Sequence, residues 1–175
     1  MKNRVVVLMY LLVLLSAFGL PKNIKKKLDK ELKKTFEIES YILENITITE
    51  ALNKTLPTKI ETDNLFKIIN DNTFLGYAFI DKAPSKTAQF DYLVLLDKDL
   101  IVIKTKVLIY REEYGGEIGS TRWLKQFIGK TQNDKLAHGE NIIAISGATI
   151  SVRSMTNAMN NFLKTVKILH SENVI

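Results

Sequence analysis

The 175-residue sequence contains no cysteine, and this absence excludes several kinds of site at once. Without a thiol the chain has no disulfide, no thiolate metal ligand, no iron–sulfur cluster and no thioether-bound haem. It also cannot carry a lipid on an N-terminal cysteine. The only histidines are His138 and His170, and neither has neighbours at metal-ligand spacing. We therefore expect no metal site.

Further absences limit the possible enzymes. No G-x-G-x-x-G follows a predicted strand, so a nicotinamide site of the Rossmann type is not indicated. No pair of residues stands out as the general acid and base for a substrate. The sequence has no internal repeat, linker or low-complexity segment, and its 46% hydrophobic and 25% charged residues are ordinary for a globular protein.

Positive charge predominates, with a formal net charge of +6, and much of it lies near the N-terminus. Lysines fill the segment 22–34, where Asp29 and Glu31 are the only acidic residues. Basic charge can indicate nucleic-acid binding, but this segment has no interleaved aromatic residues, and we expect no nucleic-acid partner. A solvated helix face beside an anionic membrane is the simpler interpretation.

The first 19 residues have the features of a targeting segment. Lys2 and Arg4 precede an uncharged, mostly apolar run of 16 residues, Val5–Leu20, which is shorter than the about 20 residues of a membrane span. This pattern fits a secretory signal peptide, with small residues at Ala17 and Gly19 that suit cleavage after Gly19. An uncleaved anchor is the alternative. We expect a protein that is exported, periplasmic or membrane-associated on the extracytoplasmic side.

Hydrophobic periodicity predicts an α+β fold in which helices flank an antiparallel sheet of hairpins. An amphipathic helix is expected over 23–35, and one or two strands over 36–49. The segment 50–58 is harder to assign, and Pro57 near its end indicates a turn or irregular link there. Two hairpins follow, and turn residues connect the two strands of each. Their strands are expected at 65–70 with 74–80 and at 90–96 with 100–110, with a loop over 81–89 between the hairpins.

The remaining sequence predicts two helices and a short strand. Ser120 can cap a short helix that runs through Phe127. A strand is expected over 141–145, and a long helix from Ser151 to about His170. We divide the chain into the targeting segment 1–19, a basic helix with lead-in strands over 20–59, and a main domain over 60–175.

A turn at 146–151, with the sequence Ser-Gly-Ala-Thr-Ile-Ser, is the first candidate binding segment. Gly147 allows a left-handed backbone at a sharp turn, and the hydroxyl of Thr149 or Ser151 can cap the helix that follows. The free amide groups at the start of that helix suit a phosphate. A turn and a helix cap without a ligand is the alternative that these residues leave open.

A glycine-bearing loop at 112–119 is the second candidate segment. The adjacent Gly115 and Gly116 let the backbone approach a flat ligand, and Tyr114 and Trp123 can pack on a ring. The alternative is a plain connection between a hairpin and a helix, with Trp123 in the core.

Together the two segments resemble the FMN-binding domain family, which includes the C subunit of the sodium-pumping quinone reductases and the G subunit of Rnf complexes. The resemblance covers residues 60–170, and the family signature S/T-G-A-T matches 146–149. It implies that Thr149 carries FMN through a phosphodiester bond, installed from FAD by a magnesium-dependent flavin transferase. It also implies that the loop from Glu113 to Gly119 is the family's glycine loop.

The resemblance implies a set of cofactor-binding residues, but the chain departs from the family pattern at one position. The family usually has an aspartate three residues before the signature serine or threonine, and this chain has Ile143. FMN that is bound without a covalent bond, or lost, is the alternative that the departure leaves open. The candidates are Ser146, Gly147, Ala148, Thr149 and Ser151 in the first segment, and Glu113, Tyr114, Gly115, Gly116, Glu117 and Trp123 in or after the second.

These features favour a flavoprotein that carries electrons, in which FMN supplies the redox chemistry, over an enzyme with its own substrate. The expected partners are a flavin transferase for maturation and a membrane redox protein as electron donor or acceptor. Two alternatives remain. One is a non-redox binding or sensory module of the same fold, and the other is a membrane-surface adaptor built on the helix at 23–35.

Overall fold

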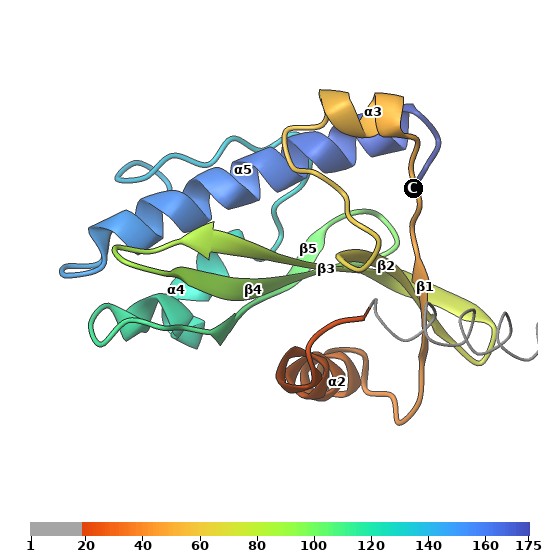
Figure 1. Cartoon of the computed structure of the whole chain (residues 1–175), viewed down its shortest axis with the longest axis horizontal. Helices are drawn as coiled ribbons and strands as arrows, with labels where there is room; N and C mark the ends of the chain where they lie inside the picture. Colours follow the sequence, from red (N-terminus) through yellow and green to blue (C-terminus); the bar gives the residue numbers. More distant parts are fainter. Residues whose placement is uncertain (1–18) are drawn as a thin grey trace, which may run out of the picture.

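The structure is a computed structural model that describes residues 19–175 (Figure 1). The predicted signal peptide or anchor at 1–19 lies outside the described residues, except for Gly19. Within residues 19–175, no helix combines the length and the apolar character that a membrane crossing requires.

A five-stranded antiparallel sheet forms the centre of the fold, and its strands follow one another in sequence order across the sheet. This arrangement confirms the predicted α+β fold, because each hairpin pairs strands that are adjacent in the chain. The strand β1 belongs to the segment 20–59 but pairs with β2. The strands are β1 (Ile42–Asn45), β2 (Leu65–Asn70), β3 (Thr73–Pro84), β4 (Gln89–Leu96) and β5 (Val102–Ile109).

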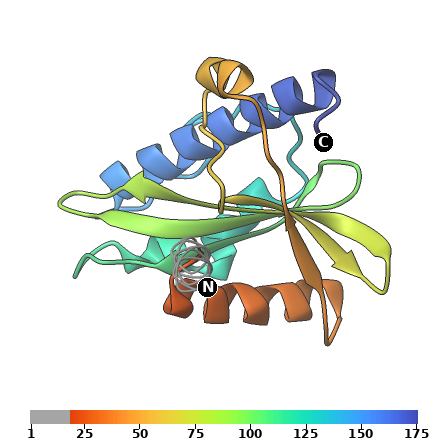
Figure 2. The ribbon, with the colours of Figure 1, turned by 45° about the vertical axis from the view of Figure 1, so that its right-hand side comes forward.

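Helices cover both faces of the sheet (Figures 1 and 2). On one face lies α2 (Lys22–Phe36), which buries Ile24, Leu28 and Leu32 against the strands. On the other face lies α5 (Thr149–Ser171), where the Phe162 ring stacks on Phe79 with 4.1 Å between ring centroids. The shorter helices are α3 (Glu50–Thr55), η1 (Gly116–Gly119), α4 (Thr121–Leu124) and η2 (Lys125–Phe127).

One helix was not predicted and one loop prediction was wrong, and local interactions explain both. The residues that the sequence left unassigned before Pro57 form α3, whose first turn is capped by Thr49: its hydroxyl accepts from the Leu52 amide at 3.3 Å. The chain around Pro57 is irregular, as predicted. The loop expected over 81–89 is shorter, because β3 continues to Pro84. Since β2 ends its pairing at Phe79, the last residues of β3 form an edge, where proline is tolerated.

The segment that precedes α5 also differs from the prediction. The strand expected over 141–145 is absent, and an isolated bridge between His138 and Ile142 takes its place. The helix α5 begins at Thr149 rather than Ser151. Its N-cap residue is Ala148, with no side-chain cap, so neither hydroxyl plays the capping role that the sequence suggested.

Candidate functional site

The structure brings the two candidate segments into contact at the N-terminal end of α5. Gly115 has φ +81°, and a Cβ placed on it would lie 3.1 Å from the Cβ of Ala148 and 2.9 Å from the hydroxyl of Tyr110. Only glycine allows the loop after β5 and the turn before α5 to lie this close. Residues that are more than 30 positions apart in the chain thus form one site.

Tyr110 links the two segments through hydrogen bonds. Its hydroxyl donates to the carbonyl oxygen of Tyr114 at 3.0 Å, and it lies 3.1 Å from the hydroxyl oxygen of Ser151. Tyr110 sits just beyond the end of β5, so the sheet positions both the glycine loop and the first turn of α5. These hydrogen bonds between protein groups hold the two segments at fixed positions relative to each other.

A cavity of about 360 Å³ opens at this junction. Thr149 is exposed at its wall, so its hydroxyl is accessible to a ligand. Tyr114, which is 81% exposed, and Ile150, which is 52% exposed, add unpacked apolar surface beside it. The lining residues are Lys86, Tyr110, Glu112, Tyr114, Gly147, Ala148, Thr149, Ile150 and Ser151.

The N-terminus of α5 faces this cavity without a side-chain cap. The first amide to bond within the helix at this end is that of Val152, which donates to the Ala148 carbonyl at 2.9 Å. The amides before it therefore have no partner inside the helix. A helix of 23 residues concentrates partial positive charge at this end, which favours an anion such as a phosphate.

Glu112 fixes the loop between β3 and β4 against the site. One carboxylate oxygen accepts from the Ser85 hydroxyl at 2.6 Å and from the amides of Thr87 and Ala88 at 2.7 and 3.1 Å. The other accepts from the Thr87 hydroxyl at 2.8 Å. Led by the Ser85 hydroxyl, these donors lower the pKa of Glu112 from 4.5 to about 2. The carboxylate is thus satisfied by this loop, which carries Lys86.

Lys86 brings positive charge to the cavity. It is exposed, and within residues 19–175 it makes no ion pair or side-chain hydrogen bond. No sequence motif predicted Lys86, Tyr110, Glu112 or Ile150 as site residues. Lys86 lies far from both glycine segments in the sequence, so no motif spacing could have found it. The β3–β4 hairpin and the Glu112 hydrogen bonds bring it to the site.

Trp123 has a different position from the other candidates. It is 5% exposed, its ring packs edge-on against Phe127, and its indole nitrogen donates to the Ile143 carbonyl at 2.7 Å. The side chain of Gln126 accepts from the Ile143 amide at 2.6 Å. Trp123 therefore supports the backbone that leads to the signature turn, and its predicted contact with a flavin stays a prediction. The Ile143 side chain is 70% exposed.

The remaining candidates lie around the cavity without lining it. Glu113 is exposed in the loop after β5, and Gly116 and Glu117 are exposed in η1. Ser146 is exposed in the turn before Ala148. Their predicted roles in cofactor binding stay predictions.

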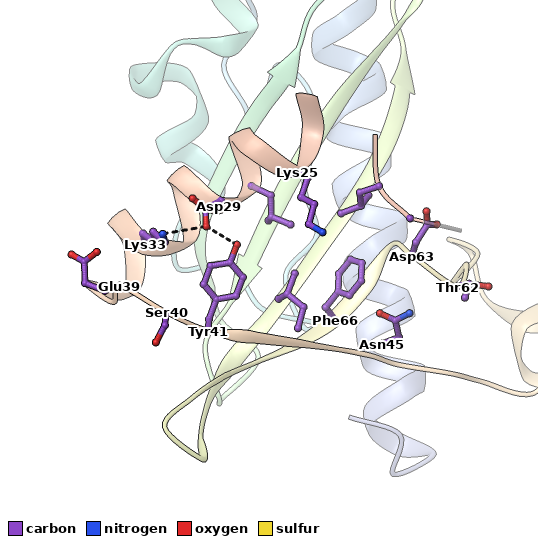
Figure 3. A pocket seen from close by; sticks show the side chains of 14 residues that line it. Lys25, Asp29, Lys33, Glu39, Ser40, Tyr41, Asn45, Thr62, Asp63 and Phe66 are labelled. Carbon is purple, nitrogen blue, oxygen red and sulfur yellow. Dashed lines mark hydrogen bonds and ion pairs between the residues drawn. The ribbon is translucent and has the colours of Figure 1, made fainter. Parts of the chain in front are cut away.

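A larger cavity, of about 570 Å³, lies between α2 and β1 (Figure 3). Its lining includes the carboxylates of Asp29, Glu39 and Asp63 and the ammonium groups of Lys25 and Lys33. Asp29 already accepts from the Tyr41 hydroxyl at 3.0 Å and pairs with Lys33 at 3.5 Å. With more carboxylates than ammonium groups, this cavity does not suit a phosphate, and we do not assign a flavin to it.

Comparison with known proteins identifies one family whose model covers both candidate segments. Residues 86–164 match the model of a family described as FMN-binding domain. The matched range begins at Lys86 and contains both glycine segments. No curated protein sequence matches the chain.

The match assigns residues 86–164 to an FMN-binding domain, and FMN is the cofactor that this match supports. The fold of the chain resembles the crystal structure of NqrC from Shewanella oneidensis, with a TM-score of 0.60. The comparison covers 89% of this chain and 100% of that chain at 14% sequence identity.

The side chains at the α5 cavity fit the phosphate of FMN. The donors are the uncapped amides of the helix start and the Lys86 ammonium group, and Thr149 offers an accessible hydroxyl. The carboxylate of Glu112, which would repel a phosphate, is engaged by four hydrogen bonds from the 85–88 loop. The chemistry of the cavity thus matches the cofactor of the family.

Proposed function

We propose that this protein is an exported or membrane-associated flavoprotein that carries FMN on Thr149 and transfers electrons outside the cytoplasm. The observation that supports this proposal most strongly is the exposed threonine in the first turn of α5, in a cavity that favours an anion. FMN supplies the redox chemistry, and the protein supplies binding, orientation and electrostatics. A membrane redox protein would serve as donor or acceptor.

Attachment would be completed by a flavin transferase that uses FAD. The Thr149 oxygen would form a bond to the phosphorus on the FMN side of FAD, and the pyrophosphate bond would break. AMP leaves with the electron pair of that bond, and the hydroxyl proton is released. No oxidant or reductant is consumed. The uncapped amides of α5 and Lys86 would hold the resulting phosphodiester, which keeps one negative charge.

A tethered cofactor suits the proposed location. An exported protein cannot rely on free flavin in its surroundings, and a phosphodiester bond prevents the cofactor from diffusing away. Tyr110 would keep the glycine loop at a fixed position beside the attachment point through its contacts with Tyr114 and Ser151. The residues of the site therefore act by positioning, and none of them needs to exchange a proton with a substrate.

The intact mass of the full chain, co-expressed with a flavin transferase, tests this proposal. We expect an increase equal to one FMN less one water. Thr149→Ala should abolish the increase, whereas Thr149→Ser keeps a hydroxyl and should retain it. Ser151→Ala is the matched control, because it removes a neighbouring hydroxyl of the same cavity. An adduct that survives in Thr149→Ala, or is lost only in Ser151→Ala, would refute attachment at Thr149.

The exposed Ile143 side chain favours a second candidate, a binding or sensory module that holds FMN without a covalent bond. The resemblance implies an aspartate at this position, and a transferase that reads this acid would not modify the chain efficiently. If so, wild-type protein should be coloured by flavin but unmodified in mass, and Ile143→Asp should gain the adduct. Equal modification of both proteins would exclude this candidate.

A further inference from the structure

The exposed face of α2 carries a continuous stripe of lysines. Lys22, Lys26, Lys30 and Lys34 recur at every fourth position and are all exposed. With 3.6 residues per turn, this spacing places the four ammonium groups on one side of the helix. The buried residues Ile24, Leu28 and Leu32 are offset by two positions, and therefore point the opposite way, into the sheet. We call these four residues the lysine stripe.

The acidic residues of α2 do not neutralise the lysine stripe. Asp29 accepts from the Tyr41 hydroxyl and pairs with Lys33. Glu31 pairs with Lys104 of β5 at 3.7 Å. Within residues 19–175, no residue of the lysine stripe forms an ion pair or a side-chain hydrogen bond. The stripe is therefore a surface of uncompensated positive charge.

The other lysines of the helix are engaged elsewhere. Lys27 donates to the carbonyl oxygen of Leu108, and Lys33 pairs with Asp29. Lys25 lines the cavity between α2 and β1 and points into it (Figure 3). Among the lysines of α2, the four of the lysine stripe are therefore the ones without such a contact in residues 19–175.

The lysine stripe is unfavourable for the helix itself. Like charges four positions apart repel one another on a helix surface, and the stripe contains three such pairs. A residue with an opposite charge at any of these positions would relieve the repulsion. The stripe is therefore compensated only if a negatively charged partner lies against it.

We propose that the lysine stripe of α2 docks on the anionic headgroups of a phospholipid bilayer. A bilayer is the partner that the observations favour, because the stripe is positively charged and because the apolar run Val5–Leu20 ends only two residues before α2 begins at Lys22, so that an uncleaved run would hold α2 at a bilayer surface. Juxtamembrane lysines are attracted by an anionic leaflet within a Debye length of its surface. This proposal does not depend on the bound flavin.

Docking through α2 also sets the orientation of the flavin site. The two helices pack on opposite faces of the sheet, with α2 in one hydrophobic cluster and α5, together with Ala148, in the other. Figure 1 shows α2 below the sheet and α5 above it. A bilayer against the lysine stripe would leave the cavity at the start of α5 accessible to a partner protein.

A single fluorescent label on the full chain tests the docking. The chain has no cysteine, so Asn23→Cys places a unique label beside the lysine stripe. Ala51→Cys places a control label on α3, which lies on the side of α5 (Figure 2). Both proteins are titrated with vesicles of phosphatidylcholine alone or mixed with phosphatidylglycerol. We expect the label at position 23 to respond only to the mixed vesicles, and salt at about 1 M to reverse the response.

Two lysine variants distinguish binding through the lysine stripe from a general effect of net charge. Changing all four stripe residues to glutamine should weaken the response by on the order of 10²- to 10³-fold. The matched control changes the exposed lysines Lys98, Lys135, Lys164 and Lys167, removes the same charge, and should respond like wild type. Circular dichroism checks that both variants are folded, and the stripe variant is expected to be, because it loses three repulsive pairs.

Several results would overturn the proposal. One is an equal response of the label at position 23 to both kinds of vesicle, since apolar insertion would then dominate. Another is an equal loss in the control lysine variant, because net charge would then explain the binding. A third is unchanged fluorescence with the mixed vesicles while heparin binds through the same four lysines, which would identify a soluble polyanion as the partner.

Discussion

Replacing Gly115 with alanine should separate the two segments that form the flavin site. Gly115 has φ +81°, and the left-handed backbone costs a non-glycine residue about 1 kcal/mol. The new Cβ would lie 2.9 Å from the Tyr110 hydroxyl and 3.1 Å from the Ala148 Cβ. If Tyr110 moves, its contacts with Tyr114 and Ser151 are lost, at about 1 kcal/mol each. We expect a total loss of about 2–3 kcal/mol in the free energy of unfolding.

Two neighbouring glycines give a matched series for this prediction. Gly147 has φ +79° but open space around it, so Gly147→Ala should cost only the backbone term of about 1 kcal/mol. Gly116 has neither a positive φ nor a close neighbour, so Gly116→Ala should be neutral or stabilising by about 0.4–1 kcal/mol. Urea unfolding of the three variants measures the differences. Equal stabilities for Gly115→Ala and Gly116→Ala would refute the contact between the loop and α5.

Three further predictions concern the surroundings of the site. Because hydrogen bonds lower the pKa of Glu112 from 4.5 to about 2, wild type should have a stabilisation that is complete above pH 4.5 and lost as the pH falls toward 2. Glu112→Gln should lack this pH-dependent part, as thermal unfolding across that range would show; parallel curves for both proteins would contradict it. Lys86→Gln should weaken FMN binding by the apoprotein by about two- to fivefold in a fluorescence titration, whereas Lys98→Gln should not, because only Lys86 lines the cavity. Phe162→Ala should lower the free energy of unfolding by about 3–5 kcal/mol in urea, since Phe162 is fully buried and stacks on Phe79; a loss below about 1 kcal/mol would count against this packing.

Local sequence signals predicted the hairpins because their determinants are short-range. The turn between β2 and β3 contains Asp71 and Asn72, both with positive φ, which suits a tight hairpin turn. The helix α2 followed from apolar residues at every fourth position, which became its buried face. By contrast, α3 depends on a single capping hydroxyl at Thr49, and its six residues are too few for a clear periodicity.

The candidate site was predictable only where a motif lies in one continuous segment. The turn at 146–149 and the glycines at 115–116 are visible in the sequence, but their contact depends on tertiary packing through Tyr110. Lys86 reaches the cavity because Glu112 binds its loop, a pairing across 25 positions that no local pattern encodes. Trp123 is buried because its neighbour Phe127 and the Ile143 carbonyl both contact it.

The position of FMN on the chain is the most direct test of this account. Cleavage by trypsin after Lys135 and Arg153 yields one peptide that contains the whole signature turn. Tandem mass spectrometry of this peptide, from protein co-expressed with a flavin transferase, should locate one FMN less one water on Thr149. An unmodified peptide, or FMN on Ser146, Ser151 or a different peptide, would contradict the proposed attachment.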